Sequence, residues 1–499
     1  MYTPRIMMSS VCAAALLTAS SAAAEVTATE VWANWKDSLA IYGEGSLIVE
    51  NEVVGADSVV AEGVALSYSD GTGSMSADLG TITLQEVGDG TVEVSMAETF
   101  PIMISDPDGG STKVTVTQEG LVLLVSGTPE EMSYDVTADS YAVVFDEVTG
   151  SDGRVDADVR ISMNGLSGTY DVVTGDLRNI DYSALIETVD ILFDVTDPGN
   201  GGNVLISGKL AGLSANAVVD LPLDMSETDP DAIFQSGFAL DGGYAFESAT
   251  FLFEIDNSDL TANGTMNAGS SAIGGAINAN AIRYETDITD VSMNVQSSDM
   301  PFPVTLSASE YGVGFAMPMA KTEEPQDFAF SIKLADLAVN EEIWMMADPG
   351  NRLPHDPATL RLDLSGMAKL LFDITDPEQA AAMAMAAAPG ELYSLDLNEL
   401  VLNFAGAAVN GSGSFTFDNS DLVTFDGLPR PEGEVTVNID GANALIDNLI
   451  AMGVLPEDQA MMGRMMMGMF ARTVGDDQLS TTIEVNSEGH VLANGQRIQ

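Results

Sequence analysis

Apolar and polar residues alternate with a period of two along most of the chain, from Ser46 to about Phe425. This is the period of a β-strand that buries one face and exposes the other. The clearest segments place apolar or β-branched side chains on one face; they are residues 81–84, 91–96, 113–117, 142–145 and 251–255. The pattern predicts a mostly β fold.

Asn-Gly and Asp-Gly dipeptides recur between the alternating segments. Both tolerate the positive φ angles of tight hairpin turns. The dipeptides begin at Asn164, Asn263, Asn410, Asn494, Asp70, Asp89, Asp108, Asp152, Asp241, Asp426 and Asp440. Turns this frequent favour long antiparallel meanders or curved sheets over βαβ units, which need long helical crossovers.

The chain also contains a near-duplicate heptapeptide. Residues Leu192 to Pro198 return as Leu371 to Pro377, with Ile in place of Val as the only difference. Residues 206–224 and 400–418 then share a pattern of strand, small-residue turn and strand. The second copy of the repeat is longer than the first, and the Ala/Met run at 380–390 is the insertion that lengthens it. We predict internally repeated blocks. Within the heptapeptide, alternation predicts a strand that ends at Asp-Pro, which makes Asp197 and Asp376 turn residues rather than a catalytic pair.

Helical patterns lie near the two ends of the chain, after residue 25 and beyond residue 440. Thr27 and Glu30 form a capping box, and an amphipathic helix is predicted to follow it up to Gly43. Its apolar positions are Val31, Trp32, Trp35 and Leu39. We expect the tryptophan pair to pack on a sheet, with ligand stacking as the alternative.

Two short helices are predicted near the C-terminus, over residues 442–452 and from Pro456 onward, where proline suits a helix start. The second contains Met461, Met462, Met465, Met466, Met467 and Met469. Thioethers can bind Cu(I), but Met is more often an adaptable apolar filler, so we expect a pliable core or a lipid-facing helix. A final hairpin is predicted from 481–485 and 491 onward, turning near Gly489.

The first 24 residues have the pattern of a signal peptide. Arg5 precedes a short apolar run at 11–19, and Ala22-Ala23-Ala24 offers a cleavage site. We expect cleavage near Ala24 and a periplasmic protein, with an uncleaved anchor as the alternative. The mature chain is divided into 25–340, with the N-terminal helix and first repeat block, and 341–499, with the second block, the Met-rich helices and the final hairpin.

Composition narrows the possible chemistry. The only cysteine, Cys12, lies in the signal segment, so the mature chain has no disulfide and no thiol site. No later run reaches the roughly 18 apolar residues of a transmembrane helix. The net charge of −59 argues against nucleic acid and against anionic lipid surfaces as partners. Solubility in a salty medium explains this charge, and binding of divalent cations or basic partners is the alternative.

No catalytic motif emerges from the sequence. H-E-x-x-H, Walker A and a strand-linked G-x-G-x-x-G are absent, as is a G-x-S-x-G nucleophile elbow. The two histidines are His355, between two prolines, and His490, after Gly489; we expect both to be exposed loop residues. We therefore assign no catalytic, cofactor-binding or metal-binding residue and predict that the protein is not an enzyme.

Calcium is the best metal candidate, because acidic clusters supply hard oxygen ligands. The clusters are Asp106-Pro107-Asp108 and Asp256-Asn257-Ser258-Asp259. Neither fits an EF-hand or a nonapeptide repeat, so we expect acidic hairpin turns.

Several short sequence segments, which we call phrases, resemble a known family when they are taken in order. They are Val31-Trp32 with Trp35-Lys36, Glu86 to Val92, Tyr134 to Asp139, Ile343-Trp344 with Asp348-Pro349-Gly350, Leu353 to Thr359, and Gly489 to Arg497. Together they resemble the alphaproteobacterial family called domain of unknown function 2125, over essentially the whole mature chain. The resemblance implies an exported, β-rich protein and supplies no catalytic residues. Ala493 departs from the valine of many members. The general pattern of this sequence is also similar, by analogy only, to that of the long β-groove envelope proteins of the AsmA kind.

These observations lead to one expected function and two alternatives. We expect a non-enzymatic envelope protein, either a packed scaffold or a β-groove for lipid or another apolar ligand. The first alternative is a calcium-dependent or adhesive β-repeat interaction protein. The second is a hydrolase whose carboxylates converge only in space.

Overall fold

The computed structural model describes residues 26–40, 46–70, 73–107, 109–150, 153–197, 199, 201–223, 233–386 and 388–499. The expected signal peptide, with Arg5, Cys12 and the cleavage site near Ala24, lies outside these residues, as does Gly43.

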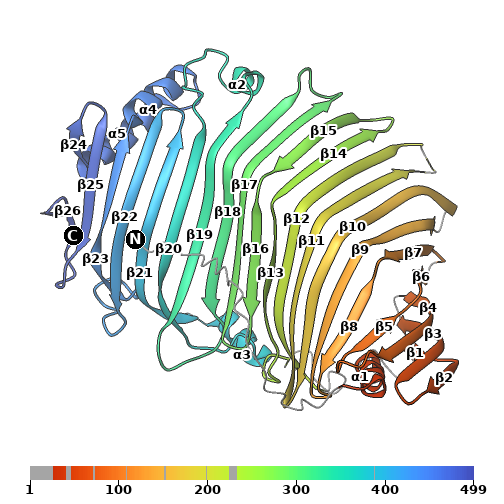
Figure 1. Ribbon diagram of the computed structural model, residues 1–499. Coiled ribbons are helices and arrows are strands. Elements are labelled where there is room, and N and C mark those ends of the chain that lie inside the picture. Colours follow the sequence, from red (N-terminus) through yellow and green to blue (C-terminus); the bar gives the residue numbers. More distant parts are fainter. Residues whose placement is uncertain are drawn as a thin grey trace, which may run out of the picture.

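The described chain forms one sheet of 27 strands, and every strand pair is antiparallel (Figure 1). The first strands are β1 Leu47–Ile48, β2 Asn51–Val54, β3 Ser58–Asp70, β4 Gly73–Glu86, β5 Val92–Ser95, β6 Thr99–Ser105, β7 Ser111–Glu119, β8 Val122–Gly127 and β9 Glu131–Gly150. The middle strands are β10 Gly153–Thr174, β11 Leu177–Thr196, β12 Asn203–Pro222, β13 Ala239–Phe246, β14 Ser248–Asp256, β15 Thr261–Ala268, β16 Ser271–Ile277, β17 Ala281–Ser297, β18 Val304–Pro318 and β19 Gln326–Val339. The last strands are β20 Ala358–Leu370, β21 Gly390–Phe404, β22 Ala407–Asp418, β23 Arg430–Asp440, β24 Arg472–Gly475, β25 Gln478–Val485, β26 Val491–Ala493 and β27 Gln496–Arg497. The predicted mostly β, antiparallel fold is confirmed.

Five helices accompany the sheet in the described chain: α1 Ala28–Ala40, α2 Glu341–Ala347, α3 Pro377–Met385, α4 Ala442–Ala451 and α5 Glu457–Phe470. The predicted N-terminal and C-terminal helices are confirmed, and α1 lies at the opposite end of the sheet from α4 and α5 (Figure 1). The capping box starts α1 as expected: the Glu30 amide donates to Thr27 Oγ1 at 3.2 Å, and the Thr27 amide donates to Glu30 Oε2 at 2.9 Å. Helices α2 and α3 were not predicted from the sequence.

The long strands bend partway along their length, so the sheet is curved (Figure 1). Left-handed residues mark the bend in alternate strands, including Gly165 and Gly212 with φ of 64° and 62°. On β11, between these two strands, Ile186 and Val189 flank the bend and are buried, whereas Glu187 between them is exposed. The bend therefore closes toward the side that carries the apolar residues.

Only some of the Asn-Gly and Asp-Gly dipeptides make turns. Asn494-Gly495 joins β26 to β27 with φ of 50° and 78°, as a tight hairpin requires. The turn prediction is wrong for four dipeptides that lie inside strands: Asn164-Gly165, Asp241-Gly242, Asn263-Gly264 and Asn410-Gly411. Gly264 shows one reason, because the ring of Phe253 on β14 covers the place where its side chain would be. Gly71, Asp108 and Asp152 lie outside the described residues.

The two copies of the heptapeptide adopt different structures. Leu192 to Thr196 end strand β11, as predicted, and Asp197 accepts a hydrogen bond from the Gly199 amide in the turn that follows. The strand prediction is wrong for the second copy, whose residues 371–376 form a turn that leads into α3. There Asp376 caps the helix by accepting from the amides of Glu378 and Gln379.

Flanking sequence explains this difference. An alanine-rich run follows Pro377 and favours a helix, whereas a glycine-rich segment follows Asp197. A second expected turn is also absent, because residues 206–222 belong to one continuous strand, β12, although 400–418 form the expected hairpin. The sheet is continuous across the 340/341 division, since β19 pairs with β20.

The packed core lies at the N-terminal end of the sheet. A cluster of buried apolar side chains joins α1 to β3, β4, β5, β8, β9 and β10, and Val31 and Trp32 of α1 are among its most deeply buried members. Beyond residue 190, the buried apolar residues of the described chain are mostly alanines, joined by Leu353, Leu479 and Val485. Most of the sheet therefore has no second layer that covers its large apolar side chains.

Candidate functional site

One face of the sheet carries a row of apolar residues, three glycines among them, that crosses it from strand to strand. Register-paired residues point to the same side of a sheet, so the strand pairing defines the row. Its members are Val125, Tyr134, Tyr170, Tyr182, Ala217, Gly242, Gly275, Tyr284, Phe315, Phe330, Leu364, Leu397, Gly413, Val435 and Ile483. We call the side of the sheet that bears this row the apolar face.

A second apolar row lies beyond the bend on the same side. It contains Leu47, Leu66, Ala77, Ile102, Val114, Phe145, Val159, Phe193, Ile206, Phe253, Gly264, Val295 and Val304. Leu47 and Leu66 line the same cavity as Tyr134 and Tyr170, which places both rows on the apolar face. Phe193 is part of the first heptapeptide copy, so that repeat contributes to this face.

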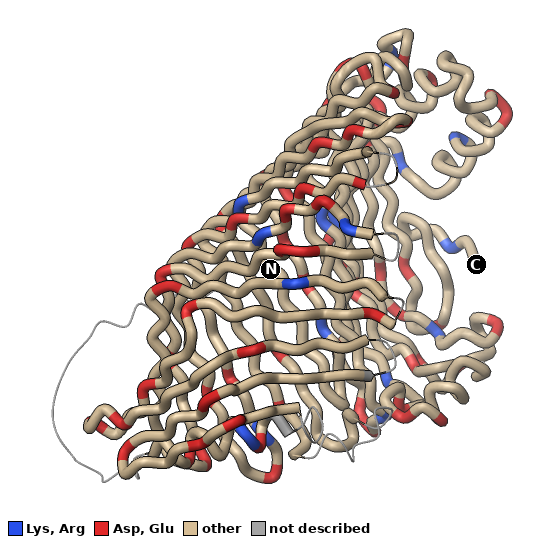
Figure 2. The backbone as a smooth tube through the Cα atoms, turned by 90° about the vertical axis from the view of Figure 1, so that its right-hand side faces the viewer, with Lys and Arg blue, Asp and Glu red and all other residues tan. Residues whose placement is uncertain are grey.

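The opposite face is polar and carries ion pairs between strands. Lys333 on β19 lies 2.9 Å from Asp287 of β17 and 3.2 Å from Glu310 of β18, and Arg361 on β20 continues the chain of charges at 2.7 Å from Glu310. Acidic residues are spread over the whole sheet (Figure 2), while basic residues are few. Asp287, Glu310 and Asp363 lie an odd number of residues from the row members of their own strands, so their carboxylates point away from the apolar face. The sheet is therefore amphipathic in this region.

The apolar face stays open to solvent in the middle of the sheet. Tyr244, Tyr284 and Phe330 are 47%, 36% and 37% exposed. An isolated exposed aromatic residue is ordinary, but a contiguous apolar patch marks a binding surface in a soluble protein.

A cavity of about 440 Å³ lies on the apolar face under α1, where the exposed part of the face meets the core. Its walls are almost entirely apolar. The lining residues are Trp32, Asn34, Trp35 and Ser38 of α1, with Leu47, Val64, Leu66, Leu79, Ile82, Leu123, Tyr134, Val136, Tyr170, Val172 and Arg178 of the sheet. This volume falls in the range of about 300–1,000 Å³ that is usual for ligand pockets.

The tryptophan pair anchors α1 over this cavity. Trp32 is buried, and its Nε1 donates to Glu52 Oε2 at 2.9 Å, which holds the pKa of Glu52 below its usual value. Trp35 lies with its ring centroid 6.5 Å from that of Trp32 and lines the cavity. Packing of the pair on the sheet is therefore confirmed, and both rings also face a space that a ligand could occupy.

Polar groups are sparse in the cavity. The Tyr134 hydroxyl lies 3.5 Å from Asn34 Oδ1, its ring makes an edge contact with Tyr170, and burial raises the pKa of Tyr134. Arg178, the second residue of β11, is the only charged residue in the lining. It was not singled out from the sequence. The sequence does contain a signal for it, because Arg178, Ile180 and Tyr182 occupy alternate positions and so lie on the same side of one strand.

A compact polar cluster holds α2 and the loop after it. The imidazole of His355 stacks on the indole of Trp344, with ring centroids 4.5 Å apart, and His355 Nδ1 lies 2.9 Å from Glu341 Oε2. The side chain of His355 is only 13% exposed, so the expectation of an exposed loop residue is wrong: stacking on Trp344 covers it. No serine, threonine or cysteine of the described residues hydrogen-bonds to this imidazole, as a catalytic nucleophile would.

Asp348 lies buried beside that histidine. Its Oδ2 accepts from the amides of Leu353 at 2.7 Å and Arg352 at 2.6 Å. The hydrogen bond from Leu353, with a smaller contribution from Arg352, lowers the pKa of Asp348. Through these bonds the Asp348 carboxylate holds the loop that follows α2.

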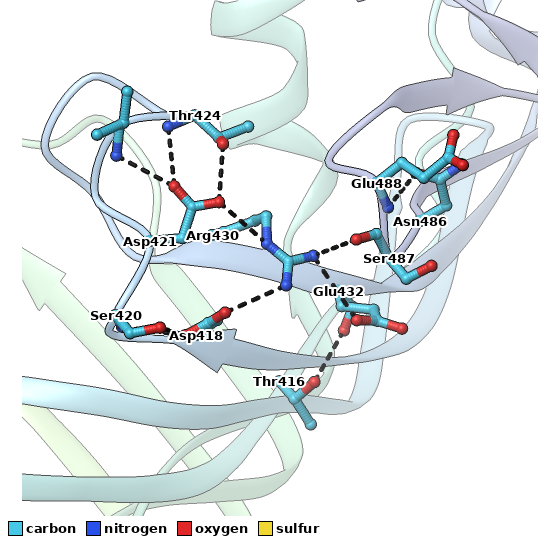
Figure 3. Close-up of polar contacts among 11 residues, drawn as sticks. Thr416, Asp418, Ser420, Asp421, Thr424, Arg430, Glu432, Asn486, Ser487 and Glu488 are labelled. Carbon is cyan, nitrogen blue, oxygen red and sulfur yellow. Dashed lines mark hydrogen bonds and ion pairs between the residues drawn. The ribbon is translucent and has the colours of Figure 1, made fainter.

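A second polar cluster centres on Arg430 at the start of β23 (Figure 3). Its guanidinium contacts Asp418 at 3.2 Å, Asp421 at 3.3 Å and Glu432 at 3.8 Å, and it donates to the Ser487 carbonyl at 2.7 Å. Arg430 therefore connects the β22–β23 turn to the last hairpin. His490, in that hairpin, is 30% exposed and pairs with Glu488.

The acidic clusters considered for calcium make turns. Asp106 accepts from the Gly110 amide, and Asn257 accepts from the amides of Asp259 and Leu260, while Asp108 lies outside the described residues. Within the ranges that the structure describes, no group of three or more His, Cys, Asp or Glu residues is arranged to hold a metal ion.

Five of the six methionines of α5 face solvent. Met461, Met462, Met465, Met466 and Met469 are all more than half exposed, and only Ala460 of the helix is buried. A core role for these methionines is therefore wrong. None of the described helices has both the length and the apolar character needed to cross a bilayer.

Comparison with known proteins agrees with the phrases found in the sequence. A family described as an uncharacterized protein conserved in bacteria, DUF2125, matches residues 240–495. This range holds the fourth and fifth phrases of the resemblance, with Trp344, Asp348 and His355, and all but the last two residues of the sixth, while the first three precede it. No curated protein and no solved structure gives a significant match. With half of the chain matched, including the middle of the apolar face and the clusters of His355 and Arg430, this protein is a member of the DUF2125 family.

Proposed function

We propose that this protein is an exported, non-enzymatic component of the bacterial envelope that binds lipid or another apolar ligand along its apolar face. The observation that carries the proposal is the exposure of Tyr284 and Phe330 within the apolar row, together with that of Tyr244, which lies two residues from the row on the same face. Leaving such a row in water costs roughly 25 cal/mol per Å² of apolar area, and an apolar ligand would remove that cost.

The burial pattern favours an open groove over a packed scaffold. A scaffold with a filled interior would bury large side chains along the whole sheet. Here the large buried side chains gather at the N-terminal end, and alanines account for most buried apolar residues beyond it. The bend at Gly165 and Gly212 turns the apolar face inward, which would shelter a ligand on two sides.

Export is supported by the signal-like first 24 residues and by the acidic composition of residues 25–499, which contain no cysteine. A non-enzymatic role is supported by the surroundings of His355, whose ring nitrogens face carboxylates rather than a nucleophile. The acidic outer face would keep a protein with an open apolar face from associating with its own copies.

Native mass spectrometry of the chain purified from a bacterial envelope fraction tests the proposal. We expect co-purified lipid that is released by organic extraction, and saturable binding of the neutral fluorescent probe N-phenyl-1-naphthylamine to the extracted protein. Absence of both would overturn the proposal.

A matched pair of variants locates the binding. Phe330→Glu places a charge on the apolar face, and Ser331→Glu places the same charge one residue away on the polar face. We expect the first variant to lose probe binding and the second to retain it. Circular dichroism and the melting temperature verify that both variants fold, and equal probe binding by the two would count against the apolar face.

A further inference from the structure

The cavity under α1 combines an apolar wall with a single positive charge. Its lining includes two tryptophans, two tyrosines and several aliphatic side chains, and Arg178 is the only charged residue among them. In a chain with 76 acidic and 17 basic residues, a lone cation at an apolar cavity is an informative exception.

Arg178 has no carboxylate partner among the residues that the structure describes, whereas nine of the other fifteen described basic residues do. The paired residues are Lys36, Lys113, Arg160, Lys209, Arg283, Lys333, Arg361, Arg430 and Arg464. A guanidinium has five donors in a fixed fork that suits a carboxylate or a phosphate. Within the described part of the chain, no carboxylate occupies the donors of Arg178, which leaves them for a ligand.

Strand geometry places this charge at the margin of the apolar face. Arg178 pairs with Thr174 of β10 and Leu221 of β12 at the end of the long strands. Going inward along β11, the same side of the sheet carries Ile180 and then Tyr182, which belongs to the apolar row. At about 3.3 Å per residue, Tyr182 lies roughly 13 Å further in. A ligand with its charge at Arg178 would extend its apolar part along this track.

We propose that the cavity under α1 binds an acyl chain that ends in an anionic group, with Arg178 holding that group at the margin of the sheet. The inference rests on the proposed function and adds the class of ligand. The apolar wall takes the hydrocarbon, and the guanidinium distinguishes an acid from a neutral lipid of the same length. The anionic end is a fatty-acid carboxylate or the phosphate of a single-chain phospholipid, which share the chemistry that Arg178 recognises.

The net negative charge of the protein makes a preference for an anionic ligand unexpected. With a net charge of −59, the chain repels anions at a distance, so non-specific binding would favour a neutral or cationic amphiphile. Preference for an anionic amphiphile would therefore report a local contact.

Quenching of tryptophan fluorescence tests the proposal. Trp32 and Trp35 line the cavity, so 9,10-dibromostearate bound there should quench them, and palmitate, lysophosphatidate and hexadecanol can then be compared as competitors with the extracted full chain. We expect palmitate or lysophosphatidate to compete at least about tenfold more strongly than hexadecanol, the scale of a charged hydrogen bond. The stronger of the two acids identifies the source of the anionic group.

Variants assign the effect to Arg178. We expect Arg178→Gln to weaken binding of the acid about tenfold while hexadecanol is unchanged, and Arg178→Lys to restore part of it. Arg154→Gln, which removes an exposed arginine of β10 outside the cavity, should change neither ligand. If a substitution alters the fluorescence quenching itself, direct titration with palmitate and hexadecanol, followed by mass spectrometry, measures binding independently.

Two failures are distinguishable. If wild-type protein binds palmitate and hexadecanol equally and Arg178→Gln has no effect, the anchor is overturned while apolar binding stands. If neither ligand binds the wild-type chain by any of these measurements, the proposed function itself fails.

Discussion

The indole of Trp344 lies parallel to the imidazole of His355, with ring centroids 4.5 Å apart and an interplanar angle of 7°. Trp344 belongs to α2 and His355 to the loop that returns to β20, so the stack closes a short excursion of the chain beside the sheet. Phe404, at the end of β21, also packs against the indole, with ring centroids 6.3 Å apart, and connects α2 to the sheet.

Replacing Trp344 should loosen this excursion without unfolding the sheet. We expect Trp344→Ala to lower local stability by about 1–3 kcal/mol, because the stacked rings and their buried area are lost, and Trp344→Phe to cost less. Hydrogen exchange of residues 341–357 measures the change, and β9 and β10 serve as an internal reference. Uniform loss of protection over the whole sheet would contradict the local role.

Asp348 should make the same loop sensitive to acid. Hydrogen bonds from Leu353 and Arg352 lower the pKa of Asp348, so its carboxylate stabilises the folded loop above the unfolded pKa of about 3.9. That contribution is lost as the pH falls through the lower, folded pKa. We expect Asp348→Asn to increase hydrogen exchange of the loop at pH 7 and to differ less from wild type at pH 3.

A second aspartate of the same loop supplies the control for this prediction. Asp356 lies in the same loop and is exposed, so Asp356→Asn should leave exchange at pH 7 unchanged. A difference between Asp348→Asn and wild type that grows as the pH falls would reverse the predicted sign.

Local pattern was sufficient to predict much of the fold. Alternation located the strands, and the pair Thr27 and Glu30 located the start of α1, because these signals depend on residues close in sequence. The near-identical motif at Leu192 and Leu371 misled, because seven residues do not fix a structure when the flanking sequence favours a helix in one copy.

The candidate site depends on information that single segments lack. The alternation of each strand shows that it has an apolar side, but only the pairing register brings Tyr284, Phe315 and Phe330 into one row. Arg178 gains its meaning in the same way, from the distant α1 residues that share its cavity. The burial of His355 likewise depends on its stack against Trp344 of α2, which the local sequence around His355 does not show.

Arg430 should be needed for the position of the last hairpin. Its guanidinium is 17% exposed and faces three carboxylates and the Ser487 carbonyl (Figure 3). We expect Arg430→Ala to destabilise this region by about 1.5–3 kcal/mol, because the acidic groups would face one another without a cation. Arg430→Lys should restore only part, since lysine lacks the planar fork. Limited proteolysis of residues 478–497 measures the effect, and equal stability of all three proteins would contradict it.

The exposed methionines of α5 should react with oxidant before methionines in the core. Met461 is 70% exposed and Met465 62%, whereas Met132 is 3% exposed in the packed cluster near α1. Because sulfoxide formation depends on access of peroxide to the sulfur, we expect peptides of residues 457–470 to gain oxygen first. Peptide mapping by mass spectrometry after a timed peroxide treatment measures this order. Circular dichroism of the treated protein should be unchanged at that stage, since the α5 methionines contribute little to packing. Early oxidation of Met132, or protection of Met461 and Met465 in the purified chain, would show that α5 is covered in solution.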